Sequence, residues 1–498
     1  MSAALPVNSI VAVIGAGAMG AGIAQVAAVA GHHVQLHDTR FGASDAAKKT
    51  IAETLAKMAA KGRMTQADAD AAAGRIATVV TLPDACVAQL VIEAIVEDSA
   101  VKRELFTRLE NVIAPECILA TNTSSISITE LAAGLAHPGR MVGMHFFNPA
   151  PVMPLVEVVS GLATSCGVAE TIFATALAWG KSPVHAATSP GFIVNRCARP
   201  FYGEGLRLLA EGAADAATLD AVLREAGGFR MGPFELMDLI GLDVNFAVTQ
   251  SVWEGFFRDP RYAPSVRQQE LVAAGWLGRK SGRGFYDYSP QAEKPAPVTE
   301  TAPPAPTRLT VHGDLGIASP LADRIAAAGV TVARERADSR FPTGALHIPG
   351  KAGGAWLALT DGRTATARVV ASGVRDIVLF DLALDYSTAS RLAVSRADSC
   401  SDDAWGAAVG ALAAAGFAVS RLDDVAGLAV MRVVCALANE AADAMVQRVA
   451  SASSIGRTRS TALPHVTHAF WSRYKSELVC ESRPITHVSL PRRTIATT

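Results

Sequence analysis

The stretch Ile10-Val-Ala-Val-Ile14-Gly15-Ala-Gly17-Ala-Met19-Gly20 decides the fold class of this chain. Its first five residues form a short apolar run, which is typical of a strand buried on both faces. A GxGxxG pattern follows directly, and the alanine-rich residues 21–30 then predict a helix. A second expected strand starts at His33 and ends in Asp38. Strand, glycine turn, helix and acidic strand end together predict a dinucleotide-binding βαβ unit.

Each residue of this motif has an expected mechanical role. Gly15 permits the tight turn, Gly17 lets the backbone approach a pyrophosphate, and Gly20 lets the helix pack closely on the strand. Ala18 and Met19 lie at the helix start, where free N–H groups and the helix dipole favour phosphates. Asp38 stands eighteen residues beyond Gly20, where it is expected to accept hydrogen bonds from the adenosine ribose. Because a carboxylate repels a 2′-phosphate, we expect NAD rather than NADP. The alternative is a glycine-rich turn in an unrelated α/β domain.

The alternation of strands and helices continues beyond the motif. Apolar runs predict strands at 76–80, 90–96 and 118–121, and the helical period predicts helices at 43–61, 65–73 and 99–113. This order is typical of an α/β domain with a doubly wound parallel sheet, whose ligands bind beyond the carboxyl ends of the strands. That rule singles out Asp38, Glu97 and Asn122-Thr-Ser-Ser125.

The composition excludes several classes of protein. Half of the 498 residues are hydrophobic, which argues against intrinsic disorder, and 45 basic residues balance 46 acidic ones, so no global field favours nucleic acid. The uncharged stretch 10–34 is long enough to span a bilayer, but its five glycines and the absence of a preceding basic residue favour the dinucleotide fold over membrane insertion. The seven cysteines show no metal-ligand spacing, so we expect reduced thiols, no metal site and a cytoplasmic location.

Two further segments carry residues suited to catalysis. His145-Phe-Phe-Asn148-Pro149 precedes Leu155-Val-Glu157-Val, an apolar strand with a carboxylate at its centre. A buried carboxylate needs a partner, and His145 is the nearest one in sequence. A histidine on an apolar strand is more often a core residue than a catalyst. A carboxylate that holds one imidazole nitrogen, however, raises the basicity of the other, as a hydride-transferring dehydrogenase requires.

Residues 8–288 resemble the 3-hydroxyacyl-CoA dehydrogenase family. The motifs that carry the resemblance occur in the family's order; they are Gly15–Gly20 with Asp38, Glu93-Ala-Ile-Val-Glu97, Asn122-Thr-Ser-Ser125, His145-Phe-Phe-Asn-Pro149, Leu155-Val-Glu157-Val, Pro190-Gly-Phe-Ile-Val-Asn195-Arg196 and Gly278-Arg-Lys280-Ser-Gly-Arg-Gly-Phe-Tyr286. The resemblance implies NAD-dependent oxidation of (S)-3-hydroxyacyl-CoA to 3-oxoacyl-CoA, in fatty acid β-oxidation or in aromatic (phenylacetate) catabolism.

The resemblance also implies roles for individual residues. His145 would take the 3-hydroxyl proton and Glu157 would orient it. Ser124 and Asn195 would hydrogen-bond the 3-oxygen of the substrate. The positions that would contact the cofactor are Glu97, Lys102, Ser124, Asn148 and Lys280, and those that would contact coenzyme A are Thr54 and Lys61. For Lys61, a solvated helix lysine is an equally good interpretation.

The remainder of the chain predicts a helical domain and a degenerate second copy. We divide it into a Rossmann domain (1–188), a helical substrate and dimerisation domain (189–288), a proline-rich linker (289–307), a degenerate nucleotide-domain-like region without a competent site (308–420), a partial second helical domain (421–452) and a basic tail (453–498). Ala426-Gly-Leu-Ala-Val-Met431-Arg432 repeats the Pro190–Arg196 motif at an offset of 236, with Met431 in place of Asn195. This arrangement resembles the long bacterial members of the family, similar to 3-hydroxyadipyl-CoA and 3-hydroxybutyryl-CoA dehydrogenases. The tail loses its apolar period, so we expect it not to pack.

Two alternative functions and two assembly states stay open at this point. A dehydrogenase of small free 3-hydroxy acids shares the dinucleotide fold but typically uses a catalytic lysine. A non-catalytic NAD(H)-binding or structural protein would not require the set Ser124, His145, Glu157 and Asn195. The chain forms either a homodimer or an internal pseudo-dimer, in which the second helical copy stands in for a partner subunit.

Overall fold

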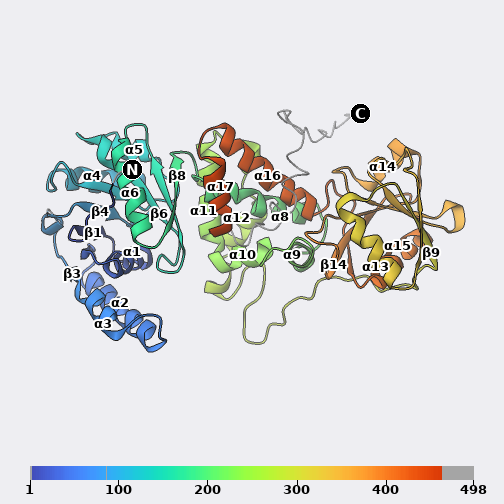
Figure 1. Ribbon diagram of the computed structural model, residues 1–498, viewed down its shortest axis with the longest axis horizontal. Coiled ribbons are helices and arrows are strands. Elements are labelled where there is room, and N and C mark those ends of the chain that lie inside the picture. The colour runs from blue at the N-terminus through green and yellow to red at the C-terminus, as the bar shows by residue number, and fades with distance from the viewer. Residues whose placement is uncertain (1–2, 86, 462–498) are drawn as a thin grey trace.

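The computed structural model describes residues 3–85 and 87–461, and the structural statements below concern these residues. A sheet domain, a central group of helices and a second sheet domain follow one another along the long axis of the molecule (Figure 1). The C-terminal helices return from the second sheet to the central group. The expected α/β domain, helical domain and second partial copy are therefore confirmed. Among the helices of these residues, none combines the length and the apolarity needed to cross a membrane.

The first sheet has eight strands in the order β3-β2-β1-β4-β5-β6-β7-β8. Their bounds are β1 Ile10–Ile14, β2 His33–His37, β3 Ile76–Thr78, β4 Leu90–Glu93, β5 Ile118–Thr121, β6 Met141–Phe146, β7 Leu155–Ser160 and β8 Ser182–Ala187. Strands β1 to β6 are parallel, as predicted, whereas β7 pairs antiparallel with β6 and parallel with β8. The antiparallel register places His145 directly opposite Glu157.

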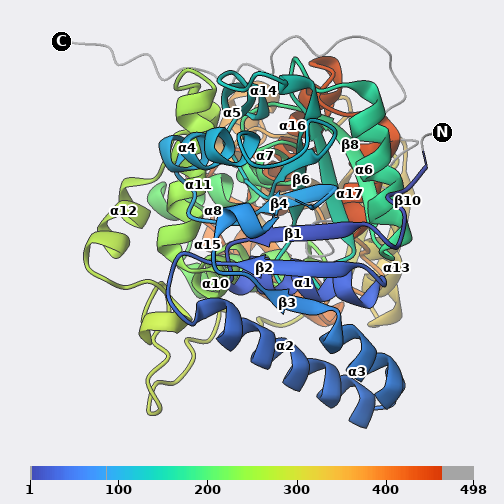
Figure 2. The ribbon, with the colours of Figure 1, turned by 90° about the vertical axis from the view of Figure 1, so that its left-hand side faces the viewer.

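Helices cover both faces of this sheet. They are α1 Ala18–Val29, α2 Ala43–Ala60, α3 Gln66–Gly74, α4 Ser99–Glu110, α5 Ile128–Ala132 and α6 Cys166–Ala178, with 3-10 turns at Leu82–Ala85 and Pro138–Arg140. Side-chain caps start several of them: Thr65 accepts from the Asp68 N–H before α3, and Asp98 accepts from the Val101 N–H before α4. Figure 2 shows α2 and α3 projecting beyond the β3 edge of the sheet.

Strand β4 ends at Glu93 and not at residue 96 as expected. The Glu93 carboxylate is fully buried, and its Oε1 accepts a hydrogen bond from the N–H of Ile95, two residues further along the chain, at 2.7 Å. This bond takes the place of a sheet partner and directs the chain out of the strand. Residues 94–97 consequently lie at the carboxyl edge of the sheet, beside the glycine turn.

The central helices are α7 Val194–Cys197, α8 Arg199–Ala210, α9 Ala216–Glu225, α10 Pro233–Ile240, α11 Leu242–Gly255 and α12 Val266–Ala273, with 3-10 turns at Pro260–Tyr262 and Arg279–Ser281. In the expected helical domain (189–288), the first helix begins only at Val194. Gly191 and Phe192 take left-handed backbone angles, with φ of 73° and 48°, so that the chain turns sharply before α7. This turn brings the N–H groups of Ile193 and Val194 to the middle of β7, where the Glu157 carboxylate accepts a hydrogen bond from each.

The proline-rich segment 289–307 contains no helix or strand but is fixed at several points. The Val298 N–H donates to Thr218 Oγ1 on α9, and the Glu300 N–H donates to the Val419 carbonyl of the second sheet. Because both bonds use backbone N–H groups, the linker follows a defined path from the helical domain to the second sheet.

The second sheet has seven strands in the order β10-β9-β11-β12-β13-β14-β15. Its elements are β9 Arg308–His312, α13 Ser319–Ala327, β10 Thr331–Glu335, β11 Ala345–Ile348, β12 Ala355–Leu359, α14 Ala365–Ser372, β13 Ile377–Phe380, β14 Arg391–Arg396, α15 Asp402–Ala414 and β15 Ala418–Arg421, with 3-10 turns at Gly316–Ala318 and Lys351–Gly353. Strand β11 is antiparallel to both neighbours, and in the described residues no helices corresponding to α2, α3 or α4 separate β10 from β12.

The offset of 236 holds across the whole second half of this domain. Helix α15 reproduces α6, and β13, β14 and β15 repeat β6, β7 and β8 with the same pairing directions. Asp381 consequently occupies the position of His145, and Ala393 occupies that of Glu157; the Asp381 N–H donates to the Ala393 carbonyl. The catalytic pair expected in the first copy has no equivalent here, in agreement with the prediction of a degenerate copy.

Two helices complete the second copy: α16 Val430–Val446 and α17 Ala452–Thr461. The residue numbers of α17 are those of α9 plus 236, so α17 is the counterpart of α9 in the repeat. Its Ile455 is buried, with 4% of the residue exposed. The expectation that the chain stops packing at residue 453 is therefore wrong for residues 453–461. Serine and threonine reduce the apolar period, but Ile455 and the buried Thr458 suffice to seat the helix against β8. The rest of the expected tail, residues 462–498, lies outside the described residues.

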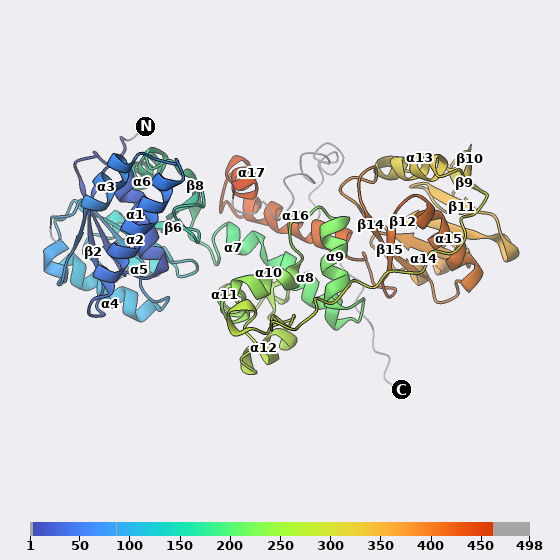
Figure 3. The same ribbon diagram turned by 90° about the horizontal axis from the view of Figure 1, so that it is seen from below.

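Helix α16 of the second copy lies beside α8 of the first (Figure 3), and reciprocal contacts join the two helical copies. Arg196 Nε lies 2.5 Å from Glu440 Oε1, and Arg432 Nε lies 2.6 Å from Glu204 Oε2. Each residue of one ion pair is the counterpart, at an offset of 236, of a residue in the other. The backbone repeats the relation, since the Ala187 N–H donates to Val449 and the Asp423 N–H donates to Ala213, both at 2.8 Å. A local pseudo-twofold axis therefore relates the two halves.

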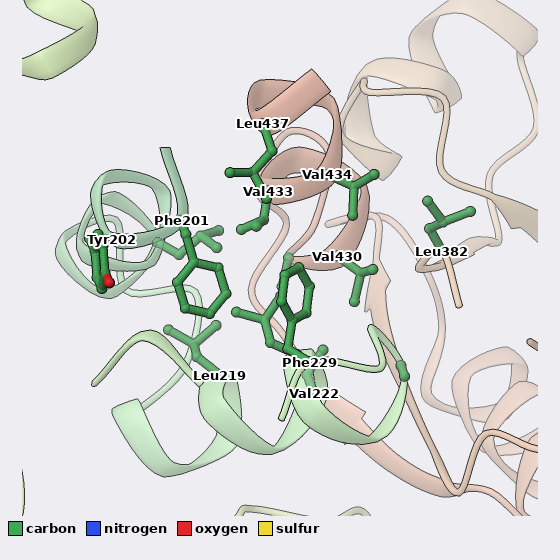
Figure 4. Packing of buried hydrophobic residues seen from close by; sticks show 14 of the residues in the cluster. Phe201, Tyr202, Leu219, Val222, Phe229, Leu382, Val430, Val433, Val434 and Leu437 are labelled. Carbon is green, nitrogen blue, oxygen red and sulfur yellow. The ribbon is translucent and has the colours of Figure 1, made fainter. Parts of the chain in front are cut away.

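An apolar cluster fills the space between the two copies. Figure 4 shows Phe201 and Val222 of the first copy packed near Val430 and Val433 of the second. All four side chains are fully buried, and they belong to a hydrophobic core that continues from the first sheet into the second. Because this shared core removes apolar side chains of both copies from water, the second copy is an integral part of the fold.

Candidate active site

A cavity of about 1550 Å³ follows the carboxyl ends of the first sheet and reaches helices α8, α10 and α11. It lies where ligands of doubly wound sheets bind. The structure brings most of the predicted site residues to its wall; they are Gly15, Gly17, Ala18, Met19, Asp38, Glu97, Lys102, Ser124, His145, Asn148 and Asn195. Gly20 and Glu157 lie directly behind this wall, each in contact with a residue that lines it.

The glycine turn leaves room for a phosphate. Gly15 has φ of 106°, and a Cβ there would lie 2.4 Å from the Ala94 carbonyl oxygen. A Cβ on Gly20 would lie 1.8 Å from the Gly15 carbonyl oxygen, so both positions require glycine for the turn itself. Nothing lies within 4 Å of a Cβ built on Gly17, at the start of α1. Gly17 therefore faces open space at a helix N-terminus, which suits an anionic ligand.

Asp38 is held as a carboxylate at the end of β2. Its Oδ2 accepts from the Ala16 N–H at 2.8 Å, and the Arg40 guanidinium binds both of its oxygens. The hydrogen bond from Arg40 lowers the pKa of Asp38 to about 2 against the opposing effect of burial. The ionised carboxylate suits the hydroxyls of a ribose. Arg40 was not foreseen, although its place two residues after the acid is a signal for such a pair.

His145 and Glu157 form a buried pair on neighbouring strands. His145 Nδ1 lies 2.6 Å from Glu157 Oε2, and their exposed fractions are 5% and 0%. Glu157 Oε1 accepts from the N–H groups of Ile193 and Val194 at 3.0 and 2.9 Å. Since a carboxylate only accepts, this geometry assigns the proton to Nδ1 and leaves Nε2 as the free nitrogen of the ring.

Ser124 and Asn195 meet beside this histidine. Asn195 Nδ2 donates to the Ser124 carbonyl at 3.4 Å, which links the helical domain to the loop after β5. Glu97 Oε1 accepts from the Ser124 N–H at 2.8 Å and from Ser124 Oγ at 3.2 Å. The serine hydroxyl and the asparagine amide are hydrogen-bonding groups of the kind that stabilise a developing oxyanion.

Lys102 fixes the acidic part of the site. Its Nζ is buried between two carboxylates, 2.6 Å from Glu93 Oε1 and 3.2 Å from Glu97 Oε2. Burial acts to raise the pKa of Glu97, but the charge of Lys102 and the hydrogen bonds from Thr123 and Ser124 outweigh it, so the pKa is lowered. Glu93 and Thr123 lie in motifs that the sequence analysis quotes, but no role was predicted for either residue. For Glu93, an acid at the end of an apolar buried strand was the available signal.

Three predicted residues lie away from the cavity wall. Lys280 pairs with Asp243 at 2.6 Å on the surface of the helical domain. Thr54 donates to the Thr50 carbonyl on α2, and Lys61 is exposed at the end of the same helix. Among residues 3–85 and 87–461, no group of three or more His, Cys, Asp or Glu side chains has the arrangement of a metal site.

The fold and this arrangement define an NAD-dependent oxidoreductase. The open Gly17 turn, the α1 N-terminus and the ionised Asp38 fit a dinucleotide, and the His–Glu pair stands beside hydrogen-bonding groups suited to an alcohol. The chain belongs to the 3-hydroxyacyl-CoA dehydrogenase family. Residues 10–189 match its NAD binding domain, 191–288 its C-terminal domain, and 357–425 the 3-hydroxybutyryl-CoA dehydrogenase reduced Rossmann-fold domain. The match to the NAD binding domain identifies NAD as the cofactor.

Two similar proteins cover nearly the whole chain, and a third covers just over half of it. The 3-hydroxyadipyl-CoA dehydrogenase of Escherichia coli K12 is 41% identical over 89% of this chain and 86% of its own. A solved structure of a 3-hydroxybutyryl-CoA dehydrogenase from Escherichia coli K12 matches with a TM-score of 0.82 at 39% identity, covering 94% of this chain and 92% of that one. The human mitochondrial hydroxyacyl-coenzyme A dehydrogenase is 42% identical, over 56% of this chain and 90% of its own.

Proposed function

We propose that this enzyme oxidises (S)-3-hydroxyacyl-CoA to 3-oxoacyl-CoA, with His145 as general base and Glu157 as the residue that orients it. The observation that carries the proposal is the 2.6 Å contact between His145 Nδ1 and Glu157 Oε2 at the wall of the cavity. It leaves Nε2 free to take a proton from a bound alcohol.

Each side chain of the site has one task in this reaction. When bound, NAD supplies the acceptor for the hydride of the carbinol carbon. His145 Nε2 takes the hydroxyl proton, and Glu157 stabilises the imidazolium that forms. Ser124 Oγ and Asn195 Nδ2 hold the 3-oxygen while its charge develops. Glu97 positions the Ser124 loop through the Ser124 N–H, and the Ser124 hydroxyl exchanges Glu97 for the 3-oxygen as its hydrogen-bond acceptor when the substrate binds. The surrounding Phe147 and Phe192, whose rings lie 4.4 and 5.8 Å from that of His145, exclude water.

The remaining expected roles belong to the same proposal. Lys280, Thr54 and Lys61 contact the bound molecules only if the helical domain or the α2–α3 hairpin moves inward, a motion that dehydrogenase gating allows. The reaction serves fatty acid β-oxidation or aromatic catabolism. A cytoplasmic location is part of the same proposal, and the scattered cysteine positions, which have no disulfide or metal-ligand spacing, support it.

We also propose that the chain is an internal pseudo-dimer. The reciprocal pairs of Arg196 with Glu440 and of Arg432 with Glu204 support it, because the second copy covers the helical face that a partner subunit would cover. Sedimentation at increasing protein concentration should give the mass of one chain throughout. A stable mass of two chains would instead support the homodimer.

The test is the reverse reaction with acetoacetyl-CoA and NADH, followed by the absorbance of reduced nicotinamide. We expect turnover, whereas a flat trace with demonstrated NADH binding would indicate a non-catalytic member of the family. Turnover of free acetoacetate but not of its thioester would indicate a dehydrogenase of free 3-hydroxy acids.

The mechanism is tested with His145→Gln. We expect kcat to fall by about 10²- to 10⁴-fold with the Kd for NADH unchanged, because general base catalysis has that size. The matched control is His185→Gln, since His185 also contacts a glutamate, Glu170 at 3.3 Å, but lies on the surface. A loss of NADH affinity in step with turnover would assign His145 a structural role.

A further inference from the structure

One buried cation stands in the substrate cavity without a counter-charge from any residue that the structure describes. The buried lysines and arginines of the described ranges are Lys102, Arg140, Lys181, Arg196, Arg199, Arg368 and Arg391. Five of them lie within 4 Å of a carboxylate. Lys181 is held by two backbone carbonyls outside the cavity wall. Arg199 alone lines the cavity and makes no ion pair with any described residue.

The contacts of Arg199 are all with neutral groups. Nε donates to the Asn195 carbonyl at 2.7 Å, and Nη1 donates to Thr249 Oγ1 at 3.0 Å. The guanidinium also lies over the ring of Tyr202, at 4.8 Å from its centre. Nη2 donates to no acceptor in the described part of the chain. A guanidinium that is 6% exposed is costly to bury without an anion, so this arrangement is suited to receive one.

The position of Arg199 identifies which part of the substrate would supply that anion. It is the first residue of α8 and is bonded to Asn195, which in the proposed function holds the 3-oxygen. The cavity wall around it is otherwise largely apolar and includes Phe201 and Val244. An apolar wall next to the 3-oxygen suits the acyl chain beyond its third carbon, and a single cation in that wall marks where the chain ends in a charge.

We propose that Arg199 binds a carboxylate at the far end of the acyl chain, which makes 3-hydroxyacyl-CoA thioesters of dicarboxylic acids the preferred substrates. The inference rests on the proposed function and names its substrate class. Guanidinium and carboxylate form strong paired hydrogen bonds, and both the free Nη2 and the buried setting favour such a bond. The phosphates of coenzyme A are the other anions of the substrate, and the experiment separates the two sources.

The experiment compares two thioesters of equal chain length that carry the same coenzyme A. 3-Hydroxyadipyl-CoA ends in a carboxylate, whereas 3-hydroxyhexanoyl-CoA ends in a methyl group. We expect the native enzyme to favour the adipyl substrate in kcat/KM. Arg199→Leu should lower the ratio of kcat/KM for the adipyl substrate to kcat/KM for the hexanoyl substrate by about 10- to 100-fold. That factor corresponds to the loss of a hydrogen bond to a charged group. The loss should appear mainly in KM for the adipyl substrate.

Two further variants keep the result interpretable. Arg199→Gln retains a hydrogen bond donor for Asn195 or Thr249 and should lower the ratio in the same direction if the leucine variant does not fold. Lys181→Met removes the other buried cation without a carboxylate partner, and it should leave the ratio unchanged. Thermal unfolding of each variant measures its stability separately from its preference.

Each outcome decides the inference. A selective loss on the adipyl substrate supports it. An equal loss on both substrates overturns it, since Arg199 would then bind coenzyme A or only position Asn195, and an unchanged ratio overturns it as well. Turnover of the hexanoyl substrate alone by the native enzyme overturns the role of Arg199 but leaves the proposed function intact. Turnover of neither substrate overturns the proposed function itself.

Discussion

Replacing Glu157 with glutamine tests the catalytic geometry most directly. The carboxylate accepts three hydrogen bonds: one from His145 Nδ1 and two from the N–H groups of Ile193 and Val194. A glutamine offers one oxygen and one NH₂ group, so it cannot satisfy all three. If the NH₂ faced the two N–H groups, two buried donors would lose their acceptor, at about 1–3 kcal/mol each.

The favoured orientation therefore turns the NH₂ group toward His145. The imidazole must then accept at Nδ1 and carry its proton on Nε2, so it cannot act as a base in that tautomer. We expect kcat of Glu157→Gln to fall by about 10³- to 10⁴-fold, close to the loss of the base itself. The cofactor site contains none of these atoms, so the Kd for NADH should stay within a factor of two or so.

The assay is the oxidation of NADH by acetoacetyl-CoA, with NADH affinity measured separately by fluorescence. Glu170→Gln serves as the control, because Glu170 contacts His185 at the surface in a similar pair. A Glu157→Gln enzyme with kcat within tenfold of the native value, while folded, would refute the assignment of the tautomer and the role of Glu157.

Three other changes give separable results. Gly17→Ala should fold normally but lose NAD affinity, since nothing surrounds its Cβ until the cofactor binds. Gly20→Ala should also lower the melting temperature, because its Cβ would lie 1.8 Å from the Gly15 carbonyl oxygen. Calorimetry and NADH titration distinguish the two variants, and equal behaviour would contradict the assignment of Gly17 to the phosphate site. Glu440→Gln leaves Arg196 buried without its counter-charge, so urea unfolding should show a loss of about 3–5 kcal/mol, and a change below 1 kcal/mol would argue against the buried ion pair. Burial raises the pKa of Asp381 to about 6 despite four backbone N–H donors, so between about pH 4 and 6 the folded state binds a proton that the unfolded state releases. The contribution of this proton to the free energy of unfolding is therefore full below about pH 4 and is lost as the pH rises through 6. The free energy of unfolding of the native chain relative to Asp381→Asn should therefore increase from pH 7 to pH 4, and a constant difference would show that Asp381 does not titrate there.

Local patterns predicted the first domain well, because its strands are buried on both faces and its glycine turn has one mechanical solution. The expected order of elements, the cavity at the strand ends and the contact of His145 with Glu157 all follow from that. The reversal of β7 and β8 was not predicted, since an apolar strand carries no information on its direction. The turn at Gly191 was missed because its left-handed residues lie inside an apolar run that has the helical period.

Residues that act across long separations were the hardest to predict. Arg199 looked like any arginine on a helix, and what distinguishes it is that no carboxylate of residues 3–85 and 87–461 pairs with it. Arg196 belongs to a motif of the active site, yet its guanidinium points away to Glu440, 244 positions later. The repeat at an offset of 236 contained this signal, because it matched both the arginines and the glutamates, but it did not show that they pair crosswise.

The crosswise pairing has a consequence for how the molecule can change. In an assembly of two identical subunits every substitution at the shared surface appears twice, and dilution separates the halves. Here both halves belong to one peptide chain, so dilution does not separate them, and a substitution at Glu440 leaves Glu204 unchanged. Gln447, which accepts from Arg196 where Glu211 accepts from Arg432, already shows the two sides drifting apart. The first half carries the His145–Glu157 pair, whereas the second half has Asp381 and Ala393 at the matching positions and contributes packing.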